Sequence, residues 1–391
     1  AITWNEKLKM TVGGDFKIGA PTGIGITISS SGNVDSIGVI TATSFKGDGS
    51  NLTGIDATTI KDGDGTVRVQ GNTSGIVITG IATAGKLGIG FTDNNVKIGN
   101  TALDSLTTGY NGVAVGNAAL TANTTGANNV AIGVDALDAN TTGSSNNAVG
   151  YGALGANTTA NSNTAIGHVA LGSNTTGASN VAVGAEALDA LTTNSYCTAI
   201  GYQSLTANTQ SNITAVGAYS LMSNTTGDYN TATGYGALEQ NTTGANNTAI
   251  GHFALEDSTT ASNNTAVGYL ALTSNTTGTR NVAVGAYALD NSTTTGDNTA
   301  IGAYALTAST TGDRNVAVGT YALDAGTTAS NCVAIGYNSL TANTTGNSNT
   351  AIGVASLEAN TTGQQNTALG SSALAANTTA SNNTAVGYQS L

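Results

Sequence analysis

A unit of 17 residues is repeated through most of the chain, and this repeat constrains the fold more than any other feature of the sequence. Aligned on the glycine that follows an apolar residue, the unit occurs eighteen times between Gly99 and Gly387 and reads N-[TV]-A-[IV]-G-x-x-[AS]-L-x-x-N-T-T-G-x-x. Every interval is 17 residues except the one from Gly201 to Gly217, which is 16. This period is too short for a pair of helices and is typical of one coil of a β-solenoid. We therefore predict an all-β fold, a parallel β-solenoid or β-roll over residues 95–391.

Within the unit, the segment N-[TV]-A-[IV]-G has the β-branched composition of a short strand. Side chains alternate between the two faces of a strand, so the Ile or Val shares a face with the residue two before it, and Ala takes the other face. We predict that the Ile or Val points into the coil and that the Leu five residues later adds a second core row. The predicted core ladder comprises Ile132, Leu137, Val149, Leu154, Ile166 and Leu171.

The stretch N-T-T-G predicts the corner of each coil, because Asn side chains hydrogen-bond to the local backbone and stabilise turns. Equivalent Asn amides of stacked coils can also bond to one another, as they do in amyloid-like ladders. We predict such a turn ladder along Asn123, Asn140, Asn157 and Asn174. The motif also matches the N-glycosylation pattern ten times, and its place at the corner explains this recurrence without a glycan.

The predicted core is thin, because each coil points only about two large apolar side chains inward while 17 residues must be ordered. Association of chains around the fibre axis would bury a second face. The small strand Ala and the small [AS] before Leu would then allow the chains to approach closely. We expect a homotrimer, with a lone solenoid as the alternative.

Residues 1–94 lack the 17-residue period and form a separate β-rich module, which we interpret as a shaft or attachment segment. Strand-like alternation occurs at residues 24–29, 39–42 and 75–79, between turns rich in Gly, Asn and Asp. The Gly- and Asp-rich run at residues 38–55 has neither a P-loop pattern nor the spacing of an EF-hand, so we predict a β-turn there.

Charge is distributed unevenly along the chain. Residues 1–99 carry eight basic and eight acidic residues, whereas residues 100–391 carry two basic and fourteen acidic residues and hold the whole net charge of −12. An acidic rod is poorly suited to phosphate backbones or anionic membranes, so we expect no nucleic-acid partner. No apolar run predicts a membrane span or signal peptide. The chain starts without Met and stops inside a repeat, so we expect either processed ends or a longer parent protein.

Residues able to support catalysis or metal binding are scattered. His168 and His252 follow the repeat glycine five coils apart, and carboxylates follow the Leu in several coils without the pattern of a calcium array. Cys197 and Cys332 occupy one repeat position eight coils apart, too far for a disulfide. We therefore predict no cofactor, no metal and no enzyme activity. A polysaccharide lyase on a β-helix and an ice-binding Thr array are the alternatives considered, and both require side-chain arrangements that these coils do not repeat.

Tyrosines fill the first or second position after the glycine in many coils. Tyr287, Tyr304 and Tyr321 fall in three consecutive coils and would form a stacked strip. Aromatic faces suit saccharides, so the strip is a candidate receptor-binding site. The alternative, which we favour, is that each ring covers its neighbour and shields the coil.

The units NTAVGYQSL, NTAIGHVAL and NVAIGVDAL, joined by NTTG, resemble repeats of bacteriophage tail-fibre and appendage proteins, and GVITATSFKGDGSNLTGI resembles segments of structural proteins of cyanobacterial phages. This resemblance implies a homotrimeric fibre at the virion surface whose partners are its own copies, other virion proteins and a host-surface glycan or protein. The unit [TV]-A-[IV]-G is also similar to the heads of trimeric autotransporter adhesins, which are left-handed parallel β-rolls. A bacterial cell-surface adhesin or filament subunit is therefore the alternative.

Overall fold

The computed structural model describes residues 16–19, 25–28, 34–37 and 94–391, which belong to two units, Ala1–Gly85 and Lys86–Leu391. In the first unit, β1 (Phe16–Gly19), β2 (Gly25–Ile28) and β3 (Val34–Ile37) form an antiparallel sheet in that order. Strand β2 confirms the strand expected at residues 24–29. The strands predicted at 39–42 and 75–79, and the turn predicted at 38–55, lie outside the described residues.

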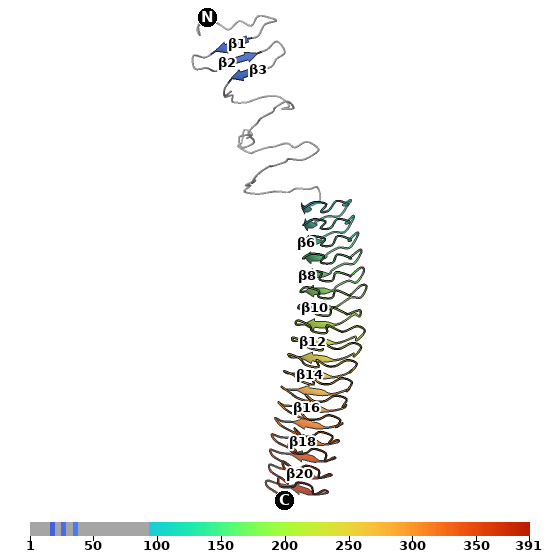
Figure 1. Ribbon diagram of the computed structural model, residues 1–391, viewed down its shortest axis with the longest axis vertical. Helices are drawn as coiled ribbons and strands as arrows, with labels where there is room; N and C mark the ends of the chain where they lie inside the picture. Colours follow the sequence, from blue (N-terminus) through green and yellow to red (C-terminus); the bar gives the residue numbers. More distant parts are fainter. Residues whose placement is uncertain (1–15, 20–24, 29–33, 38–93) are drawn as a thin grey trace. The chain divides into compact units, whose positions relative to one another are not determined.

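The second unit is a parallel β-solenoid of about 17 coils, as the repeat predicts, and the residues that the structure describes contain no helix (Figure 1). Each coil contributes one strand of three residues, and the strands pair in chain order. They are β4 (Val96–Ile98), β5 (Val113–Val115), β6 (Val130–Ile132), β7 (Asn147–Val149), β8 (Thr164–Ile166), β9 (Val181–Val183), β10 (Thr198–Ile200), β11 (Thr214–Val216), β12 (Thr231–Thr233), β13 (Thr248–Ile250), β14 (Thr265–Val267), β15 (Val282–Val284), β16 (Thr299–Ile301), β17 (Val316–Val318), β18 (Val333–Ile335), β19 (Thr350–Ile352), β20 (Thr367–Leu369) and β21 (Thr384–Val386).

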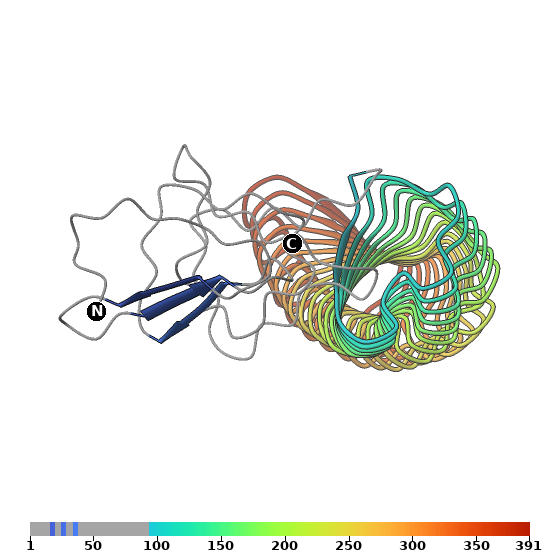
Figure 2. The ribbon, with the colours of Figure 1, turned by 90° about the horizontal axis from the view of Figure 1, so that it is seen from above.

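Strand pairing keeps every repeat position above its equivalent in the next coil. Ala131 of β6 pairs with Ala148 of β7, and Ala148 pairs with Ala165 of β8. The register survives the 16-residue interval, because Thr198 of β10 pairs with Thr214 of β11. Seen from above, the coils form a stack of loops of similar shape (Figure 2).

The strand Ala points into the coil, so the predicted inward position of the Ile or Val is wrong. Ala131 is fully buried, whereas Ile132 and Ile166 are 40% and 43% exposed, and Val149 is also partly exposed. The interior is narrow, because each of the seventeen coils from Leu103 to Leu374 also packs a buried Ala or Ser and a buried Leu inside. The small strand Ala fits beside these residues, and the β-branched side chains of the strand face outward.

The Leu row lies inside as expected, with Leu137, Leu154 and Leu171 fully buried. The Ala or Ser before each Leu is buried as well. The small residues therefore pack within the chain, and the expectation that they bring neighbouring chains together is wrong for these positions. The remaining interior is polar, with Asn side chains completing each layer.

Candidate functional site

The predicted turn ladder of Asn side chains lies inside the solenoid. The Nδ2 atom of Asn140 donates to Oδ1 of Asn123 at 2.9 Å, that of Asn157 to Asn140 at 2.8 Å, and that of Asn174 to Asn157 at 3.0 Å. Each of these amides also donates to a backbone carbonyl of its own corner. All four residues are buried, so this ladder holds coils together and the N-T-T motifs here present no exposed Asn acceptor.

A second Asn row, which we did not predict, precedes the strands. Nδ2 of Asn129 donates to the carbonyl oxygen of Gly143 at 2.7 Å, and its Oδ1 accepts the backbone N–H of Asn146 at 2.9 Å. The signal was available in the sequence, because Asn opens almost every unit. Cys197 and Cys332 replace Asn in this row, and both are buried, free thiols whose pKa is raised by that burial.

The outer face of the sheet is an uncharged stripe of β-branched residues. The first position of each strand from β4 to β21 is Thr or Val, apart from Asn147, and the third is Ile, Val or Leu, apart from Thr233. Ile200, Ile250 and Ile301 are among the exposed members. We call these two rows the outer stripe. The stripe combines Thr hydroxyl groups with exposed or half-buried aliphatic side chains and holds no charged residue.

Tyrosines on a different part of the coil join into a continuous row of rings. The aromatic row spans nine consecutive coils, and neighbouring ring centroids of successive coils lie 5.0–6.3 Å apart. Its members are Tyr202, Tyr219, Tyr235, His252, Phe253, Tyr269, Tyr287, Tyr304, Tyr321 and Tyr337. Only Tyr287, Tyr304 and Tyr321 were predicted as a strip. The full row becomes visible in the sequence when both positions after the glycine are followed together from coil to coil.

The three predicted tyrosines form the most regular part of this row. The rings of Tyr287 and Tyr304 are 5.0 Å apart and 11° from parallel, and those of Tyr304 and Tyr321 are 5.3 Å apart and 15° from parallel. Where the row passes from one position after the glycine to the other, the contact becomes edge-to-face, as between Tyr269 and Tyr287. Such pairs contribute about 0.5–1.5 kcal/mol each, so the row stabilises the stack whatever else it does.

A rim of polar side chains runs beside the stacked tyrosines. Thr307 Oγ1 donates to the carbonyl oxygen of Tyr287 at 3.1 Å, and Thr341 Oγ1 donates to that of Tyr321 at 2.7 Å. These threonines occupy the position after the Leu, which in the alternate coils is Asp290 and Asp324. Partial burial raises the pKa of both carboxyl groups. Hydroxyl and carboxylate groups therefore alternate along the rim.

The two histidines belong to aromatic stacks. His168 stacks on Tyr151 at 5.5 Å, and His252 lies between Tyr235 at 5.3 Å and Tyr269 at 5.5 Å. Within the described part of the chain, no three His, Cys, Asp or Glu side chains gather closely enough to hold a metal ion.

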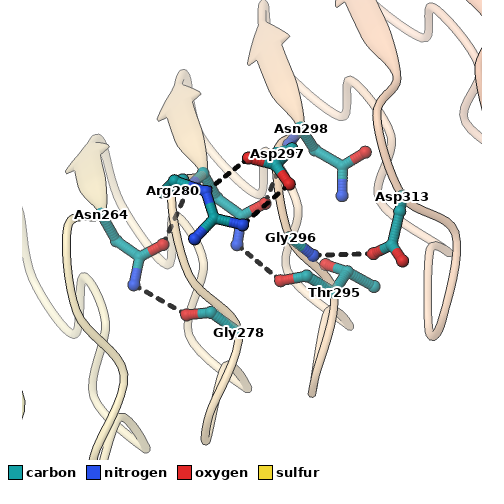
Figure 3. A network of polar contacts seen from close by, with 9 residues as sticks. Asn264, Gly278, Arg280, Thr295, Gly296, Asp297, Asn298 and Asp313 are labelled. Atoms are coloured by element: carbon teal, nitrogen blue, oxygen red, sulfur yellow. Dashed lines mark hydrogen bonds and ion pairs between the residues drawn. The ribbon is translucent and has the colours of Figure 1, made fainter.

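The charged side chains of one corner link neighbouring coils (Figure 3). Arg280 donates from Nε and Nη2 to the two carboxylate oxygens of Asp297, at 2.6 and 3.0 Å, and this hydrogen bonding lowers the pKa of Asp297. The backbone N–H of Gly296 donates to Asp313 of the following coil at 2.8 Å. Arg280 and Asp297 are exposed, so this network adds local order more than stability.

Comparison with known protein families, curated proteins and solved structures gives no match. None of the residues that the structure describes belongs to a helix long and apolar enough to cross a bilayer. Two features of the solenoid present large side chains to solvent, the outer stripe and the aromatic row.

Proposed function

We propose that this chain is a structural fibre of a bacteriophage virion, a tail fibre or appendage that attaches the particle to its host, and that it assembles as a homotrimer. The observation that carries this proposal is the outer stripe, an uncharged face of Thr and exposed aliphatic residues that extends along the whole sheet from β4 to β21. Exposed apolar surface of this extent is a mark of interaction sites. The unbroken pairing of strands from β4 to β21, together with the Asn ladders, favours a stiff, load-carrying role. The resemblance of the repeat units to phage tail-fibre proteins supports the virion setting.

Cyclic assembly about an axis parallel to the stack suits this stripe. Equivalent coils of every copy then lie at the same height, so the uncharged rows of neighbouring copies face one another along the full length. In a trimer each chain touches two neighbours, and each strand has two outward rows, one available for each neighbour. Charged residues are depleted from the centres of stable interfaces, and none occupies either row.

The assembly is tested by the mass of the protein in solution. We expect the wild type to sediment as three chains and the double variant Ile166→Lys, Ile301→Lys to sediment as one chain, because lysines on an apolar interface must be desolvated. Both isoleucines are exposed in the isolated solenoid, so the coils themselves should still fold. The matched control is Val134→Lys with Val354→Lys, two valines that are 42% and 51% exposed but follow the repeat glycine. A single-chain wild type would refute the trimer.

The virion setting is tested separately. Antibodies raised against residues 95–391 should label phage particles and not the surface of uninfected cells. Labelling of the bacterial surface instead would replace this proposal with the adhesin of the same architecture.

A further inference from the structure

The aromatic row remains open to solvent although its rings pack on one another. Tyr202, Tyr235, Tyr269, Tyr321 and Tyr337 are 36–52% exposed. Shielding of each ring by its neighbour therefore accounts for only part of its surface. Exposed and half-buried aromatic side chains thus continue across nine coils, and exposed apolar patches of this kind mark binding sites.

The period of the row restricts the ligand to a linear polymer. One ring recurs in every coil, at the spacing of parallel strands, about 4.8 Å. A ligand that engages many rings at once must have an equally short repeat and lie along the stack. A chain of linked pyranose units meets this condition with one sugar for each coil, and the apolar face of a pyranose packs against aromatic rings. Many weak contacts of this kind along one polymer add up to a high overall affinity.

The rim beside the row restricts the ligand further. Thr307, Thr341, Asp290 and Asp324 present hydroxyl and carboxylate oxygens, which accept hydrogen bonds from sugar hydroxyl groups. Glu239, Glu256 and Asp257 extend the acidic character to the coils around His252, where partial burial, and then repulsion between these groups, raises the pKa of Glu256. In the described solenoid the arginines lie at the corners, away from this rim. An anionic polymer would be repelled along the whole row.

We propose that the aromatic row binds a neutral linear polysaccharide, laid parallel to the stack with one sugar unit for each coil. The proposal deepens the attachment function proposed above by naming the chemical class of the receptor, and it rests on that function. The rings contact the sugar faces, while the rim accepts hydrogen bonds from the hydroxyl groups.

Binding is tested with linear β-1,4-linked polymers, of which hydroxyethylcellulose and carboxymethylcellulose share a backbone and differ in charge. We expect affinity electrophoresis of the full chain to show retardation by at least one neutral polymer among hydroxyethylcellulose, glycol chitin and glucomannan, and none by carboxymethylcellulose. Affinity for oligosaccharides of the retarding polymer should rise with length up to about nine units. Absence of retardation by all three neutral polymers, or stronger retardation by the anionic one, would overturn the proposal.

Variants locate the site. Tyr304→Ala should weaken binding at least tenfold, and Asp324→Ala should weaken it severalfold without removing any ring. The control is Tyr229→Ala, an exposed tyrosine of a corner outside the aromatic row. Equal loss in Tyr229→Ala, or no loss in either row variant, would overturn the proposal. Labelling of virions and the solution mass do not depend on these polymers, so failure here leaves the fibre proposal standing.

Discussion

The repeat glycine lies at a point where the backbones of successive coils approach closely. All eighteen copies have φ between +125° and +145°, where a side chain is strained. A Cβ atom at any copy from Gly99 to Gly370 would lie 2.2–2.6 Å from backbone atoms of the next glycine. Two effects therefore restrict this position to glycine, the positive φ of its own backbone and the closeness of the next coil.

Gly285→Ala should consequently destabilise the solenoid by on the order of 3 kcal/mol, since it combines backbone strain with a 2.5 Å approach to the Gly302 carbonyl oxygen. The shift in urea midpoint measures this loss. The control is Gly152→Ala, where φ is +61° but the nearest atom is 3.9 Å away and other coils carry Ala118 or Ala355. Equal shifts in the two variants would contradict the argument.

Three gaps in the turn ladder each leave the oxygen of a neighbouring Asn without a donor. Oδ1 of Asn174 precedes Leu191, that of Asn241 precedes Ser258, and that of Asn275 precedes Ser292, and all three atoms are buried without a partner. The cause is directional, because each Asn donates to the coil before it. Where the next residue is not Asn, the acceptor is left unpaired.

Ser258→Asn should therefore stabilise the protein by about 1–2 kcal/mol, since the new Nδ2 can donate to Asn241 and the new Oδ1 can accept from Asn275. Ser258 Oγ itself has no partner, so no existing hydrogen bond is lost. The reciprocal variant, Asn140→Ser, should destabilise by a similar amount in the intact ladder. Thermal melting of both variants checks the pair, and a lower melting temperature for Ser258→Asn would contradict it.

At the scale of one coil, the sequence predicted the path of the chain but not which side of the strand faces inward. Alternation determines that Val130 and Ile132 share a face and that Ala131 takes the other, and this held. The choice between inside and outside depends on the width of the interior, which the other buried Ala and Leu residues of the coil set. The usual preference of Ile for burial gave the wrong answer, because a thin coil has no room for it.

The sequence also predicted only part of the aromatic row. The run Tyr287, Tyr304 and Tyr321 is visible because these residues share one repeat position. Its extension through His252 and Phe253 depends on contacts between two different positions of neighbouring coils. Such contacts follow from ring orientation, which periodicity alone does not provide.

A coil is also the unit that can be removed. Each coil contacts mainly its two neighbours, so deletion of residues 235–251, one whole period, should leave a folded solenoid with slightly lower stability. Deletion of residues 235–242, about half a period, should unfold the surrounding coils. The inward-facing Ala and Leu positions of one coil would then stack on outward-facing positions of the next coil. Circular dichroism and thermal melting distinguish the two. Equal stability of both deletions would contradict a stack of equivalent coils.

On the scale of the whole solenoid, acidity should stabilise the fold. Partial burial raises the pKa of Asp138, Asp189, Glu239, Glu256, Asp290 and Asp324. Between the ordinary carboxyl pKa, near 4, and these raised values, the folded chain holds protons that the unfolded chain has released. Stability is thus highest below this window and is lost as the pH rises through it. Asp297, whose pKa is lowered, acts in the opposite direction at more acidic pH.

The melting temperature should accordingly rise when the pH is lowered from 7 to about 4.5 at constant ionic strength. Relief of repulsion within a solenoid that carries nearly all of the −12 charge acts in the same direction. The double variant Asp290→Asn, Asp324→Asn should melt at a higher temperature at pH 7 and show a flatter pH profile. A steady fall in melting temperature on acidification would contradict this account.

The shortened coil between Gly201 and Gly217 indicates where the chain tolerates insertions and deletions. One residue is missing, yet β10 and β11 remain paired in register, so the corner around Asn208 and Ser211 absorbs the whole change in length. Because this corner can lose a residue without disturbing the strands on either side, we expect it to tolerate inserted residues as well. A foreign peptide grafted between Gln210 and Ser211 would project sideways as a loop, which makes this corner the natural attachment point for displaying epitopes or tags on the scaffold.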